Sequence, residues 1–420
     1  MNRIPAFVPA MGLLFFLLWL SSGTLSPYAV TLEKPIVDRD CGYLYNLDHT
    51  FHLAQYRMLD GQPKHTWAYS PVLRRVLYPL CAYLPTKLLG FNWGGLLTNF
   101  LLNAFGIWVF MCLIRREIGE SAAQVALWVI VSYPGIAYWG ALPYAYGIIV
   151  PTTLVCGVLL YHLSEEDRPA RIYLYALLMG VLFTGYDLYI FFLPAMGLLL
   201  LFNRRWKEIP LAFVLVMLPT MAVMFIVQAV YGVGASNENT NIYRVVLNSY
   251  FGGYDFATWK WLLKTAPWVL LHNFFFSNFV FLPLCFIVVW LWRISCKDFA
   301  LLPFEWALLA AAGILWAFNN LAPPYEGWQM RGTWIARMYQ PVFVVMVYFL
   351  VRHRPPKWFV AGLIVAQISV CLGGVLHLPH TTMLYHHFYE HSPRPMYHVN
   401  LDTYGRRPLG FCEPMSGGQR

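Results

Sequence analysis

Long apolar runs alternate with short charged connectors along most of the chain, and this alternation predicts its elements. A helix rises about 1.5 Å per residue, so roughly 20 apolar residues cross the hydrocarbon core of a bilayer. The approximate ranges of the runs are 7–25, 95–114, 122–139, 147–163, 172–186, 188–202, 209–231, 267–292, 299–321, 334–351 and 358–376. The pattern therefore predicts an all-α polytopic integral membrane protein with about 11 transmembrane helices.

The first loop departs from this alternation. Residues 26–75 are polar, and Val76 to Gly90 is apolar but short, with two prolines and a lysine. We expect this short segment to be an interfacial or re-entrant helix, because it is too short for an ordinary crossing. The chain then divides into a transmembrane domain, residues 1–376, which includes a structured outer loop over 26–94, and a tail over 377–420.

Basic residues gather in the connectors, and their placement predicts the orientation. Cytoplasmic connectors of membrane proteins are enriched in lysine and arginine. All the clusters fall on one side when the N-terminus is cytoplasmic, which puts the first loop and the C-terminus outside. The clusters are Arg115 and Arg116; Arg168 and Arg171; Arg204, Arg205 and Lys207; Arg293 and Lys297; and Arg352, Arg354 and Lys357.

Composition excludes a soluble domain and a nucleic-acid-binding protein. Hydrophobic residues make up 59% of the chain and charged residues 12%, a balance too apolar for a water-soluble core. The net charge of +9 comes from the connector clusters rather than from one basic face, so we expect no nucleic-acid partner. The eight cysteines form no CxxC pair and no zinc spacing, which gives a redox or structural-zinc role little support.

Acids and histidines of the first outer loop are the leading candidates for chemistry. Helical spacing would put Asp48 and His52 on one face, one turn apart. A carboxylate beside an imidazole suits a proton acceptor. It also suits a divalent cation, if Asp38 or Asp40 completes the coordination shell. An interfacial amphipathic helix whose polar side faces water explains the same pattern.

Arg74, Arg75 and Tyr78 follow where the loop returns to apolar sequence. Guanidinium groups match the geometry of phosphate with paired donors, so a lipid phosphate or pyrophosphate is a natural ligand. Arginines that reach toward ordinary anionic lipids give the same pattern without any specific site.

These residues together resemble the first outer loop of the GT-C glycosyltransferases, polytopic enzymes that take sugars from polyprenyl-phosphate carriers. The residues in question are Asp48, Ala54, Met58, Leu59, Gly61, Tyr69, Arg75, Leu77, Tyr78 and Pro79. The segment YSPVLRRVLYPLCAYL is most similar to bacterial members related to mannosyltransferases, and ARMYQPVF, with Arg337 and Tyr339, is a weaker match. The family often has paired acids where this chain has Asp48 followed by His49.

The resemblance implies an inverting sugar transfer from a polyprenyl-phosphate donor to a glycan, lipid or protein acceptor outside a bacterial inner membrane. Asp48 is then the catalytic base, with Asp40 and Asp38 as alternatives. Arg75 or Arg337 would stabilise the departing phosphate. The substrate-binding candidates are His49, His52, Arg74, Arg75, Tyr78, Arg337 and Tyr339.

Other functions and sites stay open at this point. A lipid-linked-sugar flippase or other carrier would favour charges in the middle of spans, and these are nearly absent. An acyltransferase would need a partner for His272, and none is evident. The intramembrane hairpin contains a single acid, Asp187, which suits either a function or a solvated turn. A disulfide between Cys41 and Cys412 is compatible with their shared outer side.

Overall fold

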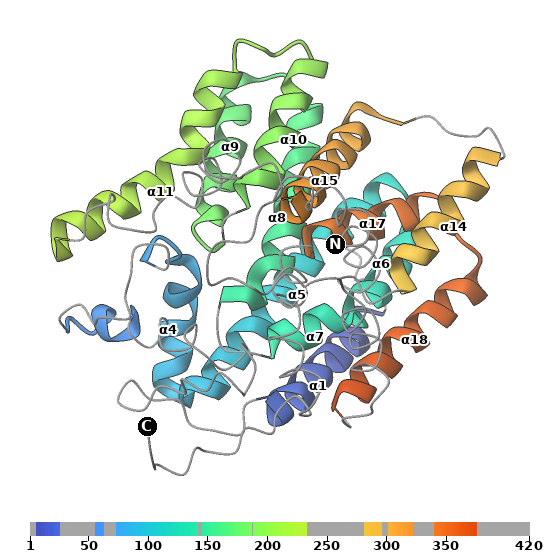
Figure 1. Cartoon of the computed structure of the whole chain (residues 1–420), viewed down its shortest axis with the longest axis horizontal. Coiled ribbons are helices and arrows are strands. Elements are labelled where there is room, and N and C mark those ends of the chain that lie inside the picture. Colours follow the sequence, from blue (N-terminus) through green and yellow to red (C-terminus); the bar gives the residue numbers. More distant parts are fainter. Residues whose placement is uncertain are drawn as a thin grey trace, which may run out of the picture.

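The computed structural model describes residues 6–25, 55–62, 73–141, 145–186, 188–232, 281–295, 301–321 and 340–375. All regular secondary structure in these ranges is helical, which confirms the all-α fold class (Figure 1). The helices are α1 (Phe7–Leu25), α4 (Leu77–Leu89), α5 (Phe91–Glu117), α6 (Glu120–Val131), α7 (Pro134–Gly140), the short 3₁₀ helix η3 (Ala145–Ile148), α8 (Ile149–Glu165), α9 (Pro169–Phe183), α10 (Tyr189–Phe202), α11 (Ile209–Tyr231), α14 (Phe281–Ser295), α15 (Pro303–Leu321), α17 (Gln340–Arg352) and α18 (Lys357–Val375).

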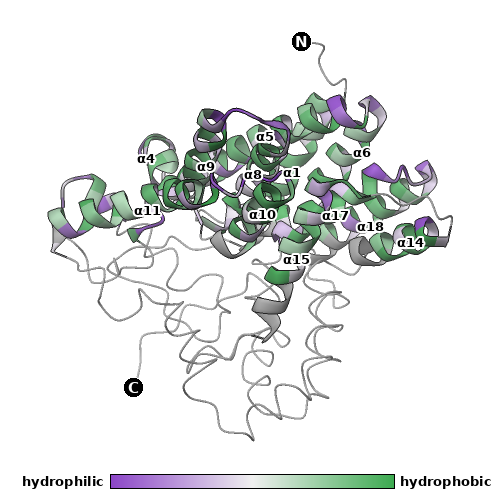
Figure 2. Cartoon of the chain, turned by 90° about the horizontal axis from the view of Figure 1, so that it is seen from above, coloured by the Kyte–Doolittle hydropathy of each residue, from purple (hydrophilic) through white to green (hydrophobic). Residues whose placement is uncertain are grey.

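Helices α5 and α8 pack against each other at the centre of the bundle (Figure 1). Helix α4 packs on α5, α11 on α9, α15 on α10, and α17 on both α6 and α8. Apolar residues run along the helices and hydrophilic residues lie at many of their ends (Figure 2). Three described segments are long and apolar enough to cross a membrane, Trp93–Glu117, Ala145–Glu165 and Ile209–Val230. The polytopic membrane fold is thereby confirmed, whereas the number of eleven crossings stays a prediction.

The basic connectors meet at one end of the bundle, which we call the charged end. Arg354 donates a hydrogen bond to the carbonyl of Ile118 at 3.2 Å, and the Arg205 guanidinium lies 2.6 Å from Asp167. Arg352 pairs with the buried Glu305 at 3.1 Å. These contacts agree with the predicted common side of the basic clusters. That this side is cytoplasmic stays a prediction.

The run over 122–139 is not one helix, which corrects the prediction of a single uninterrupted crossing. Helix α6 ends at Val131 and α7 begins at Pro134. Proline has no N–H to donate and disfavours helical geometry in the residue before it, here Tyr133. The break is held by its neighbours, because the Ser132 hydroxyl donates to Gln367 of α18 at 2.6 Å.

Helices α4 and α5 form a tight antiparallel pair that returns the first loop to the bundle. Gly90 joins them with φ of 81°, a left-handed conformation that favours glycine. A Cβ atom on Gly94 would lie 2.4 Å from the backbone of Thr86. Helix α4 has 13 residues, about 20 Å of helix. It is thus the short element that the sequence predicts, and its interfacial placement stays a prediction.

Candidate active site

The part of the first loop that the structure describes begins with a helical turn over residues 55–60. The turn ends at Gly61, where φ is +74°. The N–H of Gly61 donates to Met58 O and that of Gln62 to Arg57 O, both at 3.0 Å. This pair of bonds is a Schellman motif, which satisfies the last carbonyls of a helix. Gly61 therefore stops the helix and leaves Asp60 as its C-cap residue.

Asp60 attaches this turn to helix α4 (Leu77–Leu89). One carboxylate oxygen accepts a hydrogen bond from the Tyr83 hydroxyl at 2.5 Å, and the other accepts from Lys87 Nζ at 2.6 Å. The hydrogen bonds from Lys87, and then from Tyr83, lower the pKa of Asp60 below its usual value. Asp60 is therefore ionised at neutral pH and ties the loop to the helix.

The same turn also contacts the arginine segment. Gln55 is 5% exposed, and its side-chain amide nitrogen lies 3.5 Å from the carbonyl oxygen of Arg75. The guanidinium carbon of Arg75 lies 4.6 Å from the centroid of the Tyr186 ring. Tyr146 meets that ring edge to face, with centroids 5.7 Å apart. Arg75 is thus held between the first loop and the turn that joins α9 to α10.

Close backbone packing fixes this arrangement. The N–H of Leu77 donates to Thr184 O at 3.2 Å. A Cβ atom on Gly185 would lie 2.7 Å from Ile148 and 3.1 Å from Leu77. A larger residue at 185 would therefore require the Cδ ends of the Ile148 and Leu77 side chains to move. We call this region, with Asp60, Arg75 and Tyr186, the loop end of the bundle, because α5 and α9 connect it with the charged end.

Tyr186 is a candidate that sequence reasoning missed. The residue is 4% exposed, and its hydroxyl is buried with no hydrogen-bond partner within the described parts of the chain. Burying an unsatisfied hydroxyl costs about 1–3 kcal/mol, so this group suits a ligand or a water molecule. The available signal was an aromatic residue next to Asp187, the single acid of its hairpin.

Tyr78 lies in the interior of the bundle rather than on an exposed surface. It is fully buried and interacts with Asn99 of α5. Asn99 donates to Gly140 O at 2.9 Å, and Asn103 donates to Gly147 O at 3.0 Å. Tyr78 therefore belongs to a buried polar network that joins α4 and α5 to α7 and η3.

Most of the other predicted site residues lie outside the described part of the chain. These are Asp38, Asp40, Asp48, His49, His52, Arg337 and Tyr339. Their roles stay predictions, as does the divalent cation. Within the described residues, no group of three histidine, cysteine or acidic side chains could hold a metal ion.

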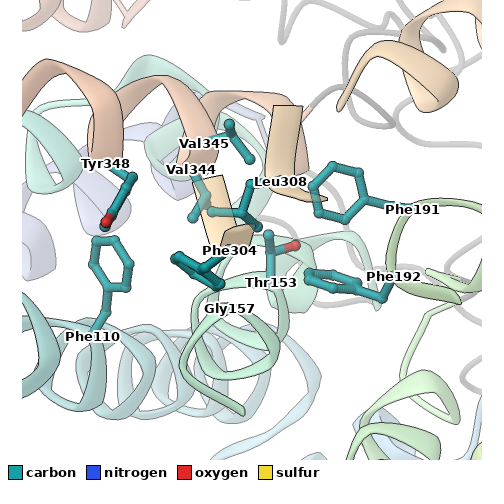
Figure 3. A pocket seen from close by; sticks show the side chains of 10 residues that line it. All are labelled: Phe110, Thr153, Gly157, Phe191, Phe192, Phe304, Leu308, Val344, Val345 and Tyr348. Atoms are coloured by element: carbon teal, nitrogen blue, oxygen red, sulfur yellow. The ribbon is translucent and has the colours of Figure 1, made fainter. Parts of the chain in front are cut away.

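A small cavity between α5, α8, α10, α15 and α17 lies apart from these groups (Figure 3). Its volume is about 10 Å³, roughly the space that one water molecule needs. Its lining residues are apolar except for Thr153 and Tyr348. The Thr153 hydroxyl donates to Ile149 O at 2.6 Å, and the Tyr348 hydroxyl donates to Glu305 at 3.3 Å. The cavity is a packing defect and has no room for a sugar or a phosphate.

The fold is similar to that of ArnT from Cupriavidus metallidurans, whose crystal structure contains undecaprenyl phosphate. The TM-score is 0.54 at 12% sequence identity, and the likeness covers 95% of this chain and 75% of the ArnT chain. The chain therefore shares the fold of this polytopic membrane protein. No protein-family model and no curated protein matches it. At this identity the likeness establishes architecture alone, and the mannosyltransferase-like subtype stays a prediction.

Proposed function

We propose that this protein is a membrane glycosyltransferase that moves a sugar from a polyprenyl-phosphate carrier to an acceptor on the outer face of the membrane. The main support is its likeness along most of the chain to ArnT, a GT-C glycosyltransferase whose structure contains such a carrier phosphate. The sequence adds the acidic first loop of that family. The proposed location is a bacterial inner membrane, within the cell envelope.

Arg75 is the proposed partner of the carrier phosphate. The central carbon of its guanidinium group lies 4.6 Å from the centroid of the Tyr186 ring, and this group is planar. The N–H donors that match phosphate lie in its plane. The buried hydroxyl of Tyr186 adds a further donor at the same place. An arginine held in this way loses little side-chain freedom when it binds an anion.

Asp48 is the proposed base, and the reaction needs little else from the protein. The Asp48 carboxylate takes the proton of an acceptor hydroxyl while that oxygen forms a bond to the anomeric carbon. The bond from the anomeric carbon to the phosphate oxygen breaks, and the oxygen leaves with the electron pair. Arg75 stabilises the charge on this phosphate. Direct displacement of this kind inverts the anomeric centre.

The test is a transfer assay with purified protein in nanodiscs. A polyprenyl-phosphate sugar labelled on the sugar is supplied with a membrane extract as the source of acceptor. We expect the label to leave the lipid and free polyprenyl phosphate to accumulate, with the heat-treated protein as control. A donor that stays intact while it crosses the bilayer of a proteoliposome would instead show a flippase and contradict the proposal.

A further inference from the structure

The contact of Asp60 with Tyr83 and Lys87, which we call the Asp60 clasp, has a geometry suited to orientation. Each carboxylate oxygen has its own donor, at 2.5 Å from Tyr83 and 2.6 Å from Lys87. Two bonds in different directions fix the rotation of the carboxylate as well as its place. The partners lie one helical turn apart on α4, so the clasp attaches Asp60 to two successive turns of that helix.

The helical turn that carries Asp60 makes two more contacts. The rings of Tyr56 and Tyr83 lie 6.4 Å apart, and Tyr56 is 6% exposed. Gln55 reaches the carbonyl of Arg75. One short turn therefore connects three places, namely Arg75 and two turns of α4. The chain enters this turn directly from the segment that contains Asp48 and His52.

We propose that the Asp60 clasp is a positioning device that holds the acidic segment of the first loop in register with Arg75 during sugar transfer. This inference rests on the proposed function. Asp60 acts through the loop and is a positioning residue, since none of its contacts is to a reacting group. The clasp attaches the turn over residues 55–60 to α4, and Gln55 attaches the same turn to the backbone of Arg75.

The clasp is too exposed to contribute much to the stability of the fold. The side chains of Lys87 and Asp60 are 49% and 28% exposed, and ion pairs in contact with water add little to stability. Helix α4 already packs on α5 through the fully buried Tyr78 and Ala82. The clasp is therefore not needed to hold α4 in the bundle. The clasp instead attaches the turn of the first loop that contains Asp60 to α4.

The test compares Asp60→Asn with Glu166→Gln in the full-length protein in nanodiscs. Glu166 pairs with Arg171 at 3.0 Å and is a matched control. The basic partner is exposed in both ion pairs, but the Glu166 pair lies at the charged end. We expect Asp60→Asn to keep the melting temperature and the affinity for undecaprenyl phosphate, while kcat falls about tenfold through misplacement of the base. Glu166→Gln should leave kcat unchanged.

Two further measurements separate positioning from folding. Hydrogen exchange over residues 48–62 should rise in Asp60→Asn and not in Glu166→Gln. The charge swap Asp60→Lys with Lys87→Asp should lower this exchange again and recover part of kcat. Unchanged exchange in Asp60→Asn, or faster exchange with a normal kcat, would overturn the inference. A lost kcat that follows a lower melting temperature and is not recovered by the swap would also overturn it.

Failure of the proposed function gives a different result. A wild-type protein that transfers no sugar from any polyprenyl-phosphate donor would refute the glycosyltransferase, and with it the role of the clasp in transfer. Hydrogen exchange needs no substrate, so a loop that loosens in Asp60→Asn would still support the clasp as the attachment of the acidic segment to α4.

Discussion

At the scale of single residues, the pairing of Arg75 with Tyr186 is the most specific feature of the loop end. The two lie more than a hundred residues apart in the sequence, and their groups are 4.6 Å apart in the structure. A cation over an aromatic face gains about 0.5–2 kcal/mol, depending on how dry the site is. The contact with the ring therefore helps to hold the guanidinium group, and a lysine lacks that planar group.

Substitutions at these two residues should separate three contributions to carrier binding: the charge of Arg75, the ring of Tyr186 and the hydroxyl of Tyr186. We expect Arg75→Ala to weaken binding of undecaprenyl phosphate about tenfold, and Arg75→Lys to lose much of the same affinity because it lacks paired donors. Tyr186→Phe keeps the ring and should lose less than Tyr186→Ala. Binding can be measured by native mass spectrometry, with the melting temperature as control. Equal affinity in wild type and Arg75→Ala would exclude Arg75 as the phosphate ligand.

At the scale of elements, helix packing depends on a few glycines. Gly180 on α9 faces α11, where an added Cβ would lie 2.4 Å from the carbonyl oxygen of Val216. Among the described helices, α11 contacts mainly α9, so this pair depends on the fit at Gly180. Gly362 of α18 offers the opposite case, since a Cβ there would meet no atom within 4 Å.

We predict that Gly180→Ala lowers stability by about 1–3 kcal/mol, the usual cost of overpacking. Gly362→Ala should be neutral or slightly stabilising, because alanine is the better helix former. Unfolding of the two variants in the same detergent, followed by the loss of helical circular dichroism, compares them directly. A Gly180→Ala protein as stable as wild type would mean that α9 and α11 are farther apart than the structure has them.

The sequence predicts elements well where a single local rule decides them. Helices α1 and α11 have the bounds of their apolar runs, because length and hydropathy suffice for a crossing. The break at Ser132 had a local signal in Pro134, which the apolar run concealed. The Asp60 clasp and the contact of Arg75 with Tyr186 had no local signal in the sequence. They depend on which helix ends the fold brings together, and no spacing rule links residues so far apart.

At the scale of the whole molecule, the two ends of the bundle differ in chemistry. The charged end collects ion pairs such as Arg205 with Asp167 and Arg352 with Glu305. The loop end holds Arg75, Tyr186 and the Asp60 clasp. A polyprenyl-phosphate sugar presented outside must meet the loop end, so the proposed function requires that the charged end be cytoplasmic.

Cysteine labelling of intact cells tests this orientation. In a variant without native cysteines, we expect Gln62→Cys to react with a membrane-impermeant maleimide from outside. Asp167→Cys should react only after the membrane is permeabilised. The Asp167 side chain is 95% exposed and Gln62 is also exposed, so burial would not explain a difference. The reverse labelling pattern would place the loop end in the cytoplasm and contradict an outer-face transfer.

The most direct test of the account is the transfer rate of Asp48→Asn beside Asp40→Asn and Asp38→Asn, with a polyprenyl-phosphate sugar as donor. Asparagine keeps the size of the side chain and removes the basic carboxylate. We expect Asp48→Asn to lose about a hundredfold or more in rate. Its melting temperature and carrier affinity should be kept, and the other two variants should lose less. Near-normal transfer by Asp48→Asn would show that Asp48 is not the base, and full activity in all three would contradict the carboxylate mechanism itself.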